Sequence, residues 1–468
     1  MLKKEYDVII IGGGIGGLVC GCYLIRKGLK TLIIEKNDTL GGYVDTFRCN
    51  GYSFNTCIRG MVGCATGGAF NRVLTDLGLE HKLDFIRPPV YDDIHFFKKK
   101  VGLHNNVEET IDEIIRQFPK EKKAVNEFFQ LLRDDSAITE IYKYRRLSFQ
   151  KLLNEYFKEK ELKFLFSAMR IDSGLMPSRT SAIADFMLIK GNILDGGYLP
   201  NGGMKSLVEL FAKYFKEKGG HVILNTFIKK IKLNKYKAEG VLSSDDLFFG
   251  AKVIVSNIDA TYTFNSLLGR GNVSDKFLDE INAMEPSASV FLIYLGLGKP
   301  IKSYFRYNCS AVWHFNKSLA GGIVCLPASL IDSSFAPQNA SSVTAYFGVR
   351  FEDEQYWIAN KARIADIFIK RLNRILPISR RDIKLLAINS PYDLYKKTLN
   401  RDGASRGWSP CIKQFNNFFP PFQTHVENVF LAGHWVASAV GNGGVTFSAL
   451  IGKKVANYIV NNHNNVAQ

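Results

Sequence analysis

The chain of 468 residues has no hydrophobic run long enough to cross a bilayer and no signature of a metal or disulfide site. Its longest apolar stretches, around Val8–Ile11 and Ser289–Leu297, fall far short of the ~20 residues that a spanning helix needs. Its eight cysteines form no C-x-x-C pair and have no histidine partners at zinc-ligand spacing. No apolar leader precedes the first strand. We therefore expect reduced thiols, no metal and a cytoplasmic protein.

Acidic residues are fewer than basic ones, since 61 Lys and Arg against 44 Asp and Glu give a net charge of +17. A surface of this sign favours anionic partners such as nucleic acid or acidic lipid. No nucleic-acid recognition motif accompanies the charge, so we expect no nucleic-acid partner. Charged residues make up only 22% of the chain and 34 Phe outnumber 20 Tyr, which favours a lipophilic ligand. A hydrophobic content of 46% excludes a disordered chain.

The chain opens with a complete βαβ unit. A strand, a glycine turn, a helix and a second strand are predicted at Asp7–Ile11, Gly12–Gly17, Leu18–Lys27 and Thr31–Ile34. Gly12, Gly14 and Gly17 form the pattern G-x-G-x-x-G: the first permits a tight turn, the second lets the backbone approach a pyrophosphate, and the third allows close helix–strand packing. Backbone N–H groups and the helix dipole then face the phosphates, so the unit predicts a dinucleotide site.

Glu35 ends the second strand, where a carboxylate accepts hydrogen bonds from a ribose. The same charge repels a 2′-phosphate, which favours NAD or FAD over NADP. The alternative is a solvated glutamate at a strand end. Gly41 and Gly42 follow, and they place a second close-approach backbone near the phosphate loop.

Four blocks carry a family resemblance. The block Glu35–Thr46 resembles the second fingerprint of FAD oxidoreductases of the amine oxidase and phytoene desaturase type. Asn50–Asn55 is similar to the G-Y-x-F-D segment of phytoene desaturases, carotenoid isomerases and retinol saturases, and Tyr198–Met204 is similar to their P-x-G-G-M segment. Asn428–His434 with Gly441–Val445 resembles the closing FAD motif, in which a helix N-terminus points at the pyrophosphate or flavin.

The resemblance implies FAD as the cofactor. It places Ile228 against the adenine, and it gives His434 a hydrogen bond to a flavin phosphate or ribityl group, or else a structural role. The expected FAD-binding residues are Gly12, Gly14, Ile15, Gly16, Gly17, Glu35, Lys36, Gly41, Gly42, Tyr43, Ile228, Gly433, His434, Gly443, Gly444 and Val445. No Ser-His-Asp triad or pair of acids emerges, so the catalytic residues stay unassigned; in a flavoprotein the cofactor carries the hydride chemistry.

The predicted fold is α/β, with a Rossmann-like FAD-binding domain of the glutathione reductase and amine oxidase type. It is interleaved with a mixed-sheet substrate domain and a helical cap. The FAD domain is expected to consist of residues 1–70, 195–270 and 411–468, and the substrate domain with its cap of residues 71–194 and 271–410. The region from Asn71 to about Leu194 is predicted to be mostly helical, for example at Val107–Phe118, Lys122–Arg133 and Phe149–Met169.

The resemblance implies an oxidoreductase that acts on carbon–carbon bonds of a long apolar polyene or isoprenoid, by desaturation, saturation or isomerisation. One alternative is an amine oxidase or porphyrinogen oxidase-like flavoenzyme. Another is a non-enzymatic binder like the Rab GDP-dissociation inhibitors, which bind prenylated proteins without using flavin. Those inhibitors lack the full set of phosphate-loop glycines. The sequence assigns no oligomeric state.

Lysine runs and phenylalanines occur together in the helical region. The runs are Lys98–Lys100, Lys120–Lys123 and Lys143–Arg146, and the aromatic residues include Phe128, Phe129, Phe149, Tyr156, Phe157, Phe164 and Phe166. One reading is an amphipathic surface that rests on an anionic membrane, with Phe and Leu among the acyl chains. The other is a set of ordinary solvated helices over a hydrophobic core. The first reading predicts a protein held peripherally at the membrane.

Overall fold

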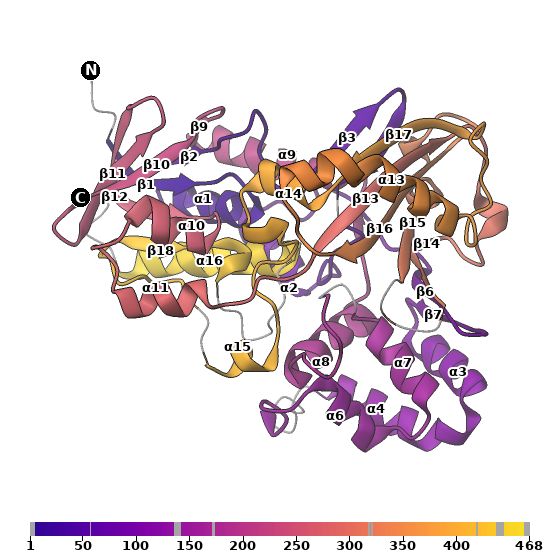
Figure 1. Ribbon diagram of the computed structural model, residues 1–468. Helices are drawn as coiled ribbons and strands as arrows, with labels where there is room; N and C mark the ends of the chain where they lie inside the picture. Colours follow the sequence, from indigo (N-terminus) through magenta and orange to yellow (C-terminus); the bar gives the residue numbers. More distant parts are fainter. Residues whose placement is uncertain are drawn as a thin grey trace.

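The computed structural model describes residues 5–56, 58–134, 142–170, 174–316, 319, 322–417, 420–436 and 444–462. They form three parts (Figure 1): a lobe built on a mainly parallel sheet, a second lobe on a mixed sheet, and a module of helices beside the second lobe. This arrangement confirms the predicted fold class.

The first sheet contains seven described strands in the order β10-β11-β12-β1-β2-β9, with β18 beside the end of β12. The strands are β1 (Glu5–Ile11), β2 (Thr31–Ile34), β9 (His221–Ile223), β10 (Ile228–Asn234), β11 (Lys237–Ser243), β12 (Phe248–Ser256) and β18 (Val429–Leu431). β9, β2, β1, β12 and β18 run parallel, whereas β10, β11 and β12 form antiparallel pairs. The carboxyl ends of the parallel strands therefore lie at one edge.

Both faces of the first sheet are covered. Val8 and Ile10 share a core with α1, α9 and α16, whereas Ile9 and Ile11 share another with α10 and α11. These helices are α1 (Ile15–Arg26), α9 (Met204–Glu217), α10 (Ala260–Tyr262), α11 (Asp275–Asn282) and α16 (Val445–Asn462). Because helices bury both faces, β1 reads as a continuous apolar run rather than an alternating one.

The second sheet contains seven described strands in the order β17-β13-β16-β15-β14-β6-β7. They are β6 (Val90–Phe96), β7 (Lys99–His104), β13 (Ser289–Leu297), β14 (Cys309–Phe315), β15 (Ile323–Leu326), β16 (Ser341–Val349) and β17 (Ile383–Asn389). Along β13, Phe291 and Ile293 pack with α13 (Glu354–Leu372), and Leu292 and Tyr294 belong to the core shared with the helical module. Because β14 and β6 pair in parallel, the sheet is mixed.

The remaining elements connect these parts. A short hairpin pairs β3 (Thr46–Cys49) with β4 (Tyr52–Asn55), and a separate two-stranded sheet pairs β5 (Phe85–Ile86) with β8 (Leu199–Pro200). The connecting helices are α2 (Ala69–Leu77), α12 (Ala328–Ile331), α14 (Pro391–Thr398) and α15 (Ile412–Asn417). α2 packs against α16 of the first lobe, so that lobe reaches past residue 70.

The helical module differs from its prediction in two places. It consists of α3 (Val107–Gln117), α4 (Lys122–Arg133), α6 (Phe149–Tyr156), α7 (Lys160–Ala168) and α8 (Ala182–Lys190). The predicted continuous helix Phe149–Met169 is wrong, because the chain extends at Phe157 and a new helix begins at Lys160. The buried carboxylate of Glu121 accepts hydrogen bonds from the backbone N–H groups of Lys158 (2.6 Å) and Glu159 (2.5 Å), which stabilises the break. In addition, β6 and β7 interrupt the predicted helical region and join the second sheet.

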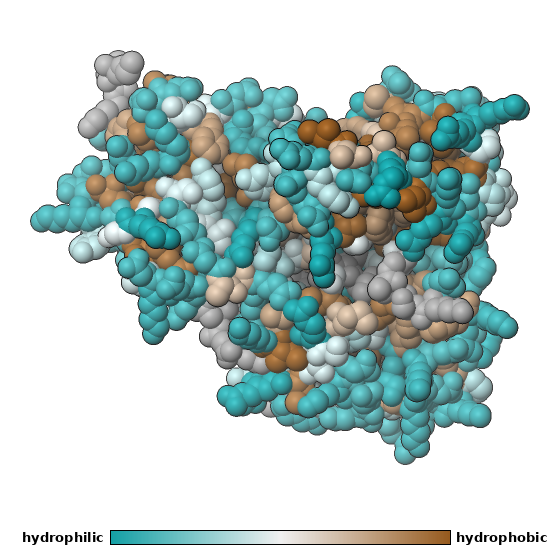
Figure 2. Space-filling model, viewed as in Figure 1, coloured by the Kyte–Doolittle hydropathy of each residue, from teal (hydrophilic) through white to brown (hydrophobic). Residues whose placement is uncertain are grey.

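The aromatic side chains of the module lie in its interior. Phe128, Phe129, Phe149, Phe157 and Phe166 are at most 1% exposed, and the face of the module seen in Figure 2 is mostly hydrophilic. The reading that places these phenylalanines among acyl chains is therefore wrong for these five, since they form the core on which the helices assemble.

Candidate functional site

Four strand ends meet at one edge of the first sheet. Ile11 at the end of β1 is in register with Ile34 of β2 and with Ser256 of β12, and Ser256 is in register with Leu431 of β18. The residues that follow these strands are Gly12, Glu35, Asn257 and Ala432. In parallel α/β sheets this edge is where ligands bind.

The turn after β1 brings the backbone of α1 close to the β12 and β18 turns. Gly12 has φ of +95°, and a Cβ there would lie 2.7 Å from Cγ2 of Ile258. A Cβ at Gly16 would lie 2.7 Å from Oδ1 of Asn257 and 2.9 Å from Cα of Gly433. Only glycine fits these positions. No side chain caps α1 at Gly14, so the first N–H groups of the helix are available to an anion.

Glu35 lies beside this turn and is 6% exposed. Its carboxylate accepts hydrogen bonds from the backbone N–H groups of Gly13 (2.8 Å) and Asn37 (3.0 Å). Its neighbour Lys36 donates to the carbonyl of Lys396 (2.8 Å), and burial lowers the pKa of the Lys36 ammonium, although Glu35 opposes this. The carboxylate is thus held in place at the cavity wall, as ribose recognition requires.

Tyr43 and His434 form an aromatic pair across the cavity wall. Their rings are stacked with centroids 6.3 Å apart, and the Tyr43 hydroxyl donates to the carbonyl of Ala404 (3.1 Å). Burial lowers the pKa of His434 from 6.5 to about 4, although part of the side chain faces the cavity. The imidazole is therefore neutral near pH 7, and it can donate from one ring nitrogen and accept at the other.

The predicted residues converge on one cavity. Those that line it are Gly12, Gly14, Ile15, Gly16, Glu35, Lys36, Gly41, Gly42, Tyr43, Ile228, Gly433, His434, Gly444 and Val445. Gly17 lies behind the wall, where a Cβ would come within 2.5 Å of the Gly12 carbonyl oxygen; this is the close helix–strand packing expected of it. Gly443 lies outside the described residues.

Two other groups of lining residues carried no local signal strong enough to predict them. The last turn of α14 contributes Lys397 to the same cavity, and the segment after α14 contributes Asn400. Lys397 forms an ion pair with Asp45 (2.7 Å), and Asn400 accepts a hydrogen bond from Nε1 of Trp435 (2.8 Å). The second group comes from the loop after β4, the helical module and the second sheet: Arg59, Tyr91, Leu188, Asn192, Val290, Leu292 and Tyr346.

A family model described as "Flavin containing amine oxidoreductase" matches residues 15–460. The chain belongs to this family. It is a flavin-dependent oxidoreductase with FAD as its cofactor. The glycines, the uncapped helix and the fixed carboxylate fit this cofactor, because they offer N–H donors to a pyrophosphate and an acceptor to a ribose within one cavity.

The sequence relatives of this family member include proteins with names from carotenoid and retinoid chemistry. The chain is 26% identical over 342 residues to the inactive all-trans-retinol 13,14-reductase of Danio rerio, covering 63% of this chain and 56% of that one. It is 25% identical over 491 residues to the chloroplastic prolycopene isomerase of Arabidopsis thaliana, covering 96% and 82%. It is 22% identical over 483 residues to the lycopene-forming phytoene desaturase of Pantoea ananas, covering 94% and 96%.

Solved structures share the fold of this oxidoreductase. An oxidoreductase from Methanosarcina mazei aligns with a TM-score of 0.73 at 16% identity, covering 97% of this chain and all of that one. A protoporphyrinogen oxidase from Exiguobacterium, named as putative, aligns at 0.63 with 14% identity over 98% and 99%. The Rab GDI of Plasmodium falciparum aligns at 0.57 with 13% identity over 92% and 93%.

Proposed function

We propose that this oxidoreductase acts on carbon–carbon bonds of a long apolar polyene or isoprenoid. The observation that carries the proposal is the wall of the cavity beyond the strand ends. There Leu188 of α8 and Val290 and Leu292 of β13 continue the cavity in which the predicted cofactor residues lie. Apolar walls favour a hydrocarbon body, and the names of the sequence relatives agree with such a substrate.

The chain's residues divide the task of holding FAD. In this proposal the N–H groups at the start of α1 bind the pyrophosphate, Glu35 accepts from the ribose, and Ile228 at the start of β10 packs against the adenine. In the same proposal, the turn at Gly433 and the start of α16 at Val445 lie beside the flavin part of the cofactor. Bound FAD supplies the hydride chemistry, while the protein orients the substrate and excludes water.

His434 serves as a neutral hydrogen-bonding group in this proposal. Because its pKa is lowered to about 4, the imidazole is neutral near pH 7 and is not the imidazolium that a general acid would require. Its stacking on Tyr43 fixes the ring orientation. We assign it the positioning of a ribityl or phosphate group rather than general acid catalysis.

The test is anaerobic incubation of the flavin-loaded protein with polyenes, once with oxidised and once with reduced flavin. Mass spectrometry then separates loss of two hydrogens, gain of two hydrogens and an unchanged mass with altered double-bond geometry. These outcomes distinguish desaturation, saturation and isomerisation. A protein that binds flavin but changes no polyene, and oxidises an amine or a porphyrinogen, would establish the alternative flavoenzyme class instead.

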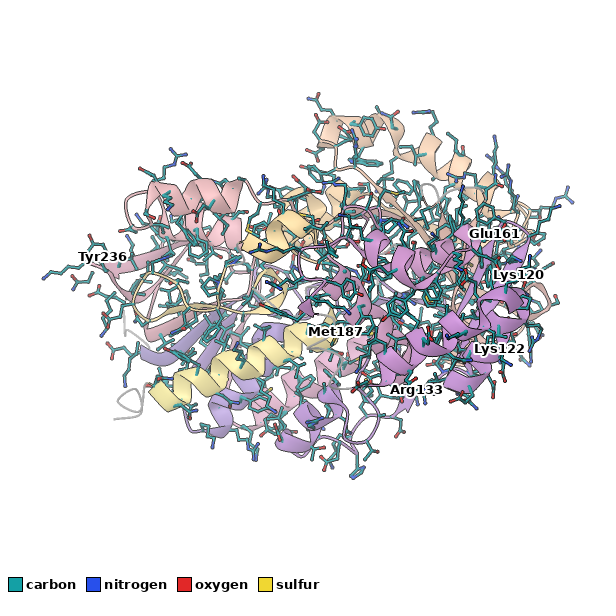
Figure 3. The ribbon with its side chains drawn as sticks, turned by 90° about the horizontal axis from the view of Figure 1, so that it is seen from below. Lys120, Lys122, Arg133, Glu161, Met187 and Tyr236 are labelled. Carbon is teal, nitrogen blue, oxygen red and sulfur yellow. The ribbon has the colours of Figure 1, made fainter. Side chains whose placement is uncertain are left out.

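We also propose a peripheral contact with an anionic lipid surface at one end of the helical module. Tyr142 and Met176 are 60% and 48% exposed, and the segments that follow them come together where the Phe149 N–H donates to the Thr180 carbonyl (3.0 Å). Basic residues follow Tyr142 directly: Lys143, Arg145 and Arg146. Elsewhere on the module Lys120, Lys122 and Arg133 point outward (Figure 3). The described part of the chain has no helix long and apolar enough to cross a membrane.

Liposome flotation tests this contact. A Lys143→Glu/Arg146→Glu variant is expected to lose binding to acidic vesicles, whereas Lys213→Glu on the distant helix α9 retains it. Binding of the parent chain should weaken at high salt, because exposed charges are screened. Binding indifferent to lipid charge and to salt would refute the contact.

A further inference from the structure

The part of the cavity beyond the predicted cofactor residues is not uniformly apolar. Besides the apolar side chains of Leu188, Val290 and Leu292, its lining includes polar groups, among them the guanidinium of Arg59 and the amide of Asn192. A site for a plain hydrocarbon gains nothing from buried polar groups, because each loses its contact with water. The hydrogen bonds that these polar groups make, or lack, therefore indicate which polar groups a ligand in the cavity carries.

Asn192 belongs to a π-helical turn, Gly191–Asp195, that continues α8. The residue is 6% exposed, and its side-chain nitrogen, Nδ2, is buried with no hydrogen-bond partner in the described part of the chain. An unsatisfied buried amide is costly, and single π-turns inside helices occur frequently at functional sites. The orphaned amide lines the cavity, so a ligand is the partner that it can still acquire.

The charge of Arg59 is already compensated. Its guanidinium pairs with the carboxylate of Asp92, and the two side chains are 7% and 0% exposed. It also lies 4.6 Å from the ring centroid of Tyr91 and 5.1 Å from that of Trp313. A buried, paired arginine adds polarity to this region without demanding an anion. Because Arg59 is neutralised by Asp92 and the Asn192 amide carries no charge, we take the partner of Asn192 to be a neutral hydrogen-bond acceptor.

We propose that the lipophilic substrate carries a neutral oxygen function, a hydroxyl or a carbonyl, and that Asn192 recognises it. This inference rests on the proposed polyene or isoprenoid substrate. A carboxamide donates from its nitrogen and accepts at its oxygen, so it pairs with either oxygen function. A hydrocarbon of the same skeleton leaves the amide unsatisfied, and one neutral hydrogen bond of this kind corresponds to about a ten-fold difference in affinity.

The test compares two ligands on the flavin-loaded full chain: a polyene alcohol, and the hydrocarbon of the same skeleton with hydrogen in place of the hydroxyl. Dissociation constants are read from the change in flavin absorbance on titration. We expect the parent chain to prefer the alcohol by about ten-fold, and Asn192→Leu, which has the same branched shape but no polar atoms, to abolish the preference. Leu188→Met is the matched control, because it alters the same cavity without touching the amide and should leave the ratio of the two affinities unchanged.

Three results would overturn the inference alone: equal affinity of the parent chain for both ligands, an unaltered preference in Asn192→Leu, or loss of flavin from that variant, since the amide would then belong to the cofactor site. Flavin occupancy is measured on each variant before titration, so a misfolded protein is recognised at that step. If Asn192→Leu is misfolded, Asn192→Ser replaces it in the test. This variant keeps a polar group at the position and should retain part of the preference for the alcohol over the hydrocarbon. A parent chain that holds flavin but binds neither ligand would overturn the proposed substrate class and this inference with it.

Discussion

The buried imidazole of His434 makes the stability of the flavin-free protein depend on pH. Its pKa in the folded chain is about 4, below the ordinary 6.5 that it regains on unfolding. The unfolded chain therefore binds a proton more strongly between these values. The stabilisation is fully present above pH 6.5 and is lost as the pH falls towards 4.

The difference in pKa corresponds to about 3 kcal/mol, which is an upper value because cavity water solvates part of an imidazolium ring. His434→Gln removes the titration and keeps a neutral polar side chain. Between pH 7 and about 4, we expect the free energy of unfolding of the parent chain to fall by up to about 3 kcal/mol more than that of the variant.

Urea unfolding of flavin-free protein at a series of pH values measures this difference. His81→Gln serves as the control, since His81 is exposed and lies outside the cavity. The control should follow the parent chain. If His434→Gln showed the same fall in stability as the parent chain between pH 6.5 and 4, the imidazole would not be held neutral by burial, and the reasoning would be refuted.

Three further variants probe the site and the module that covers it. Gly14→Val should reduce flavin occupancy by about ten-fold or more, because a Cβ there lies 3.1 Å from Nδ2 of Asn257 and the branched side chain covers the start of α1. Full flavin absorbance of this variant would show that the phosphates bind elsewhere. Arg170→Met leaves the fully buried carboxylate of Asp185 without its ion-pair partner (2.8 Å), so the free energy of unfolding, measured in urea, should fall by about 3–5 kcal/mol. A smaller fall would mean that Asp185 takes up a proton instead. Phe128→Ala empties the centre of the module core and should cost about 3–5 kcal/mol, with an unchanged flavin spectrum; loss of flavin would show that the module and the first lobe unfold together.

The parts of the site that local rules govern could be predicted from the sequence. The turn at Gly12 needs a backbone that only glycine adopts freely, and the carboxylate of Glu35 follows a strand whose apolar run is unmistakable. The closing segment at Gly433 could be placed by resemblance, and the structure brings it within 2.9 Å of where a Cβ of Gly16 would lie.

The parts that depend on distant contacts could not be predicted. The break between α6 and α7 arises from hydrogen bonds to Glu121, which lies on another helix and follows no pattern visible at residues 157–159. Asn400 and Asn192 enter the cavity from segments that carry no binding motif, because tertiary packing alone brings them there. The burial of Phe128 and Phe129 likewise follows from the assembly of the module, since the same amphipathic pattern also fits a membrane surface.

The edge at which β1, β2, β12 and β18 end also constrains the order in which the protein matures. β1 leaves the ribosome more than four hundred residues before β18 and the start of α16. At a synthesis rate of about 5–20 residues per second, tens of seconds pass between the synthesis of the glycine turn after β1 and that of β18 and the start of α16. The cofactor site is thus completed only after β18 and the start of α16 have been made. During the interval, α1 packs on one face of β1 and β2 pairs along its edge, and these are the elements available to shield it.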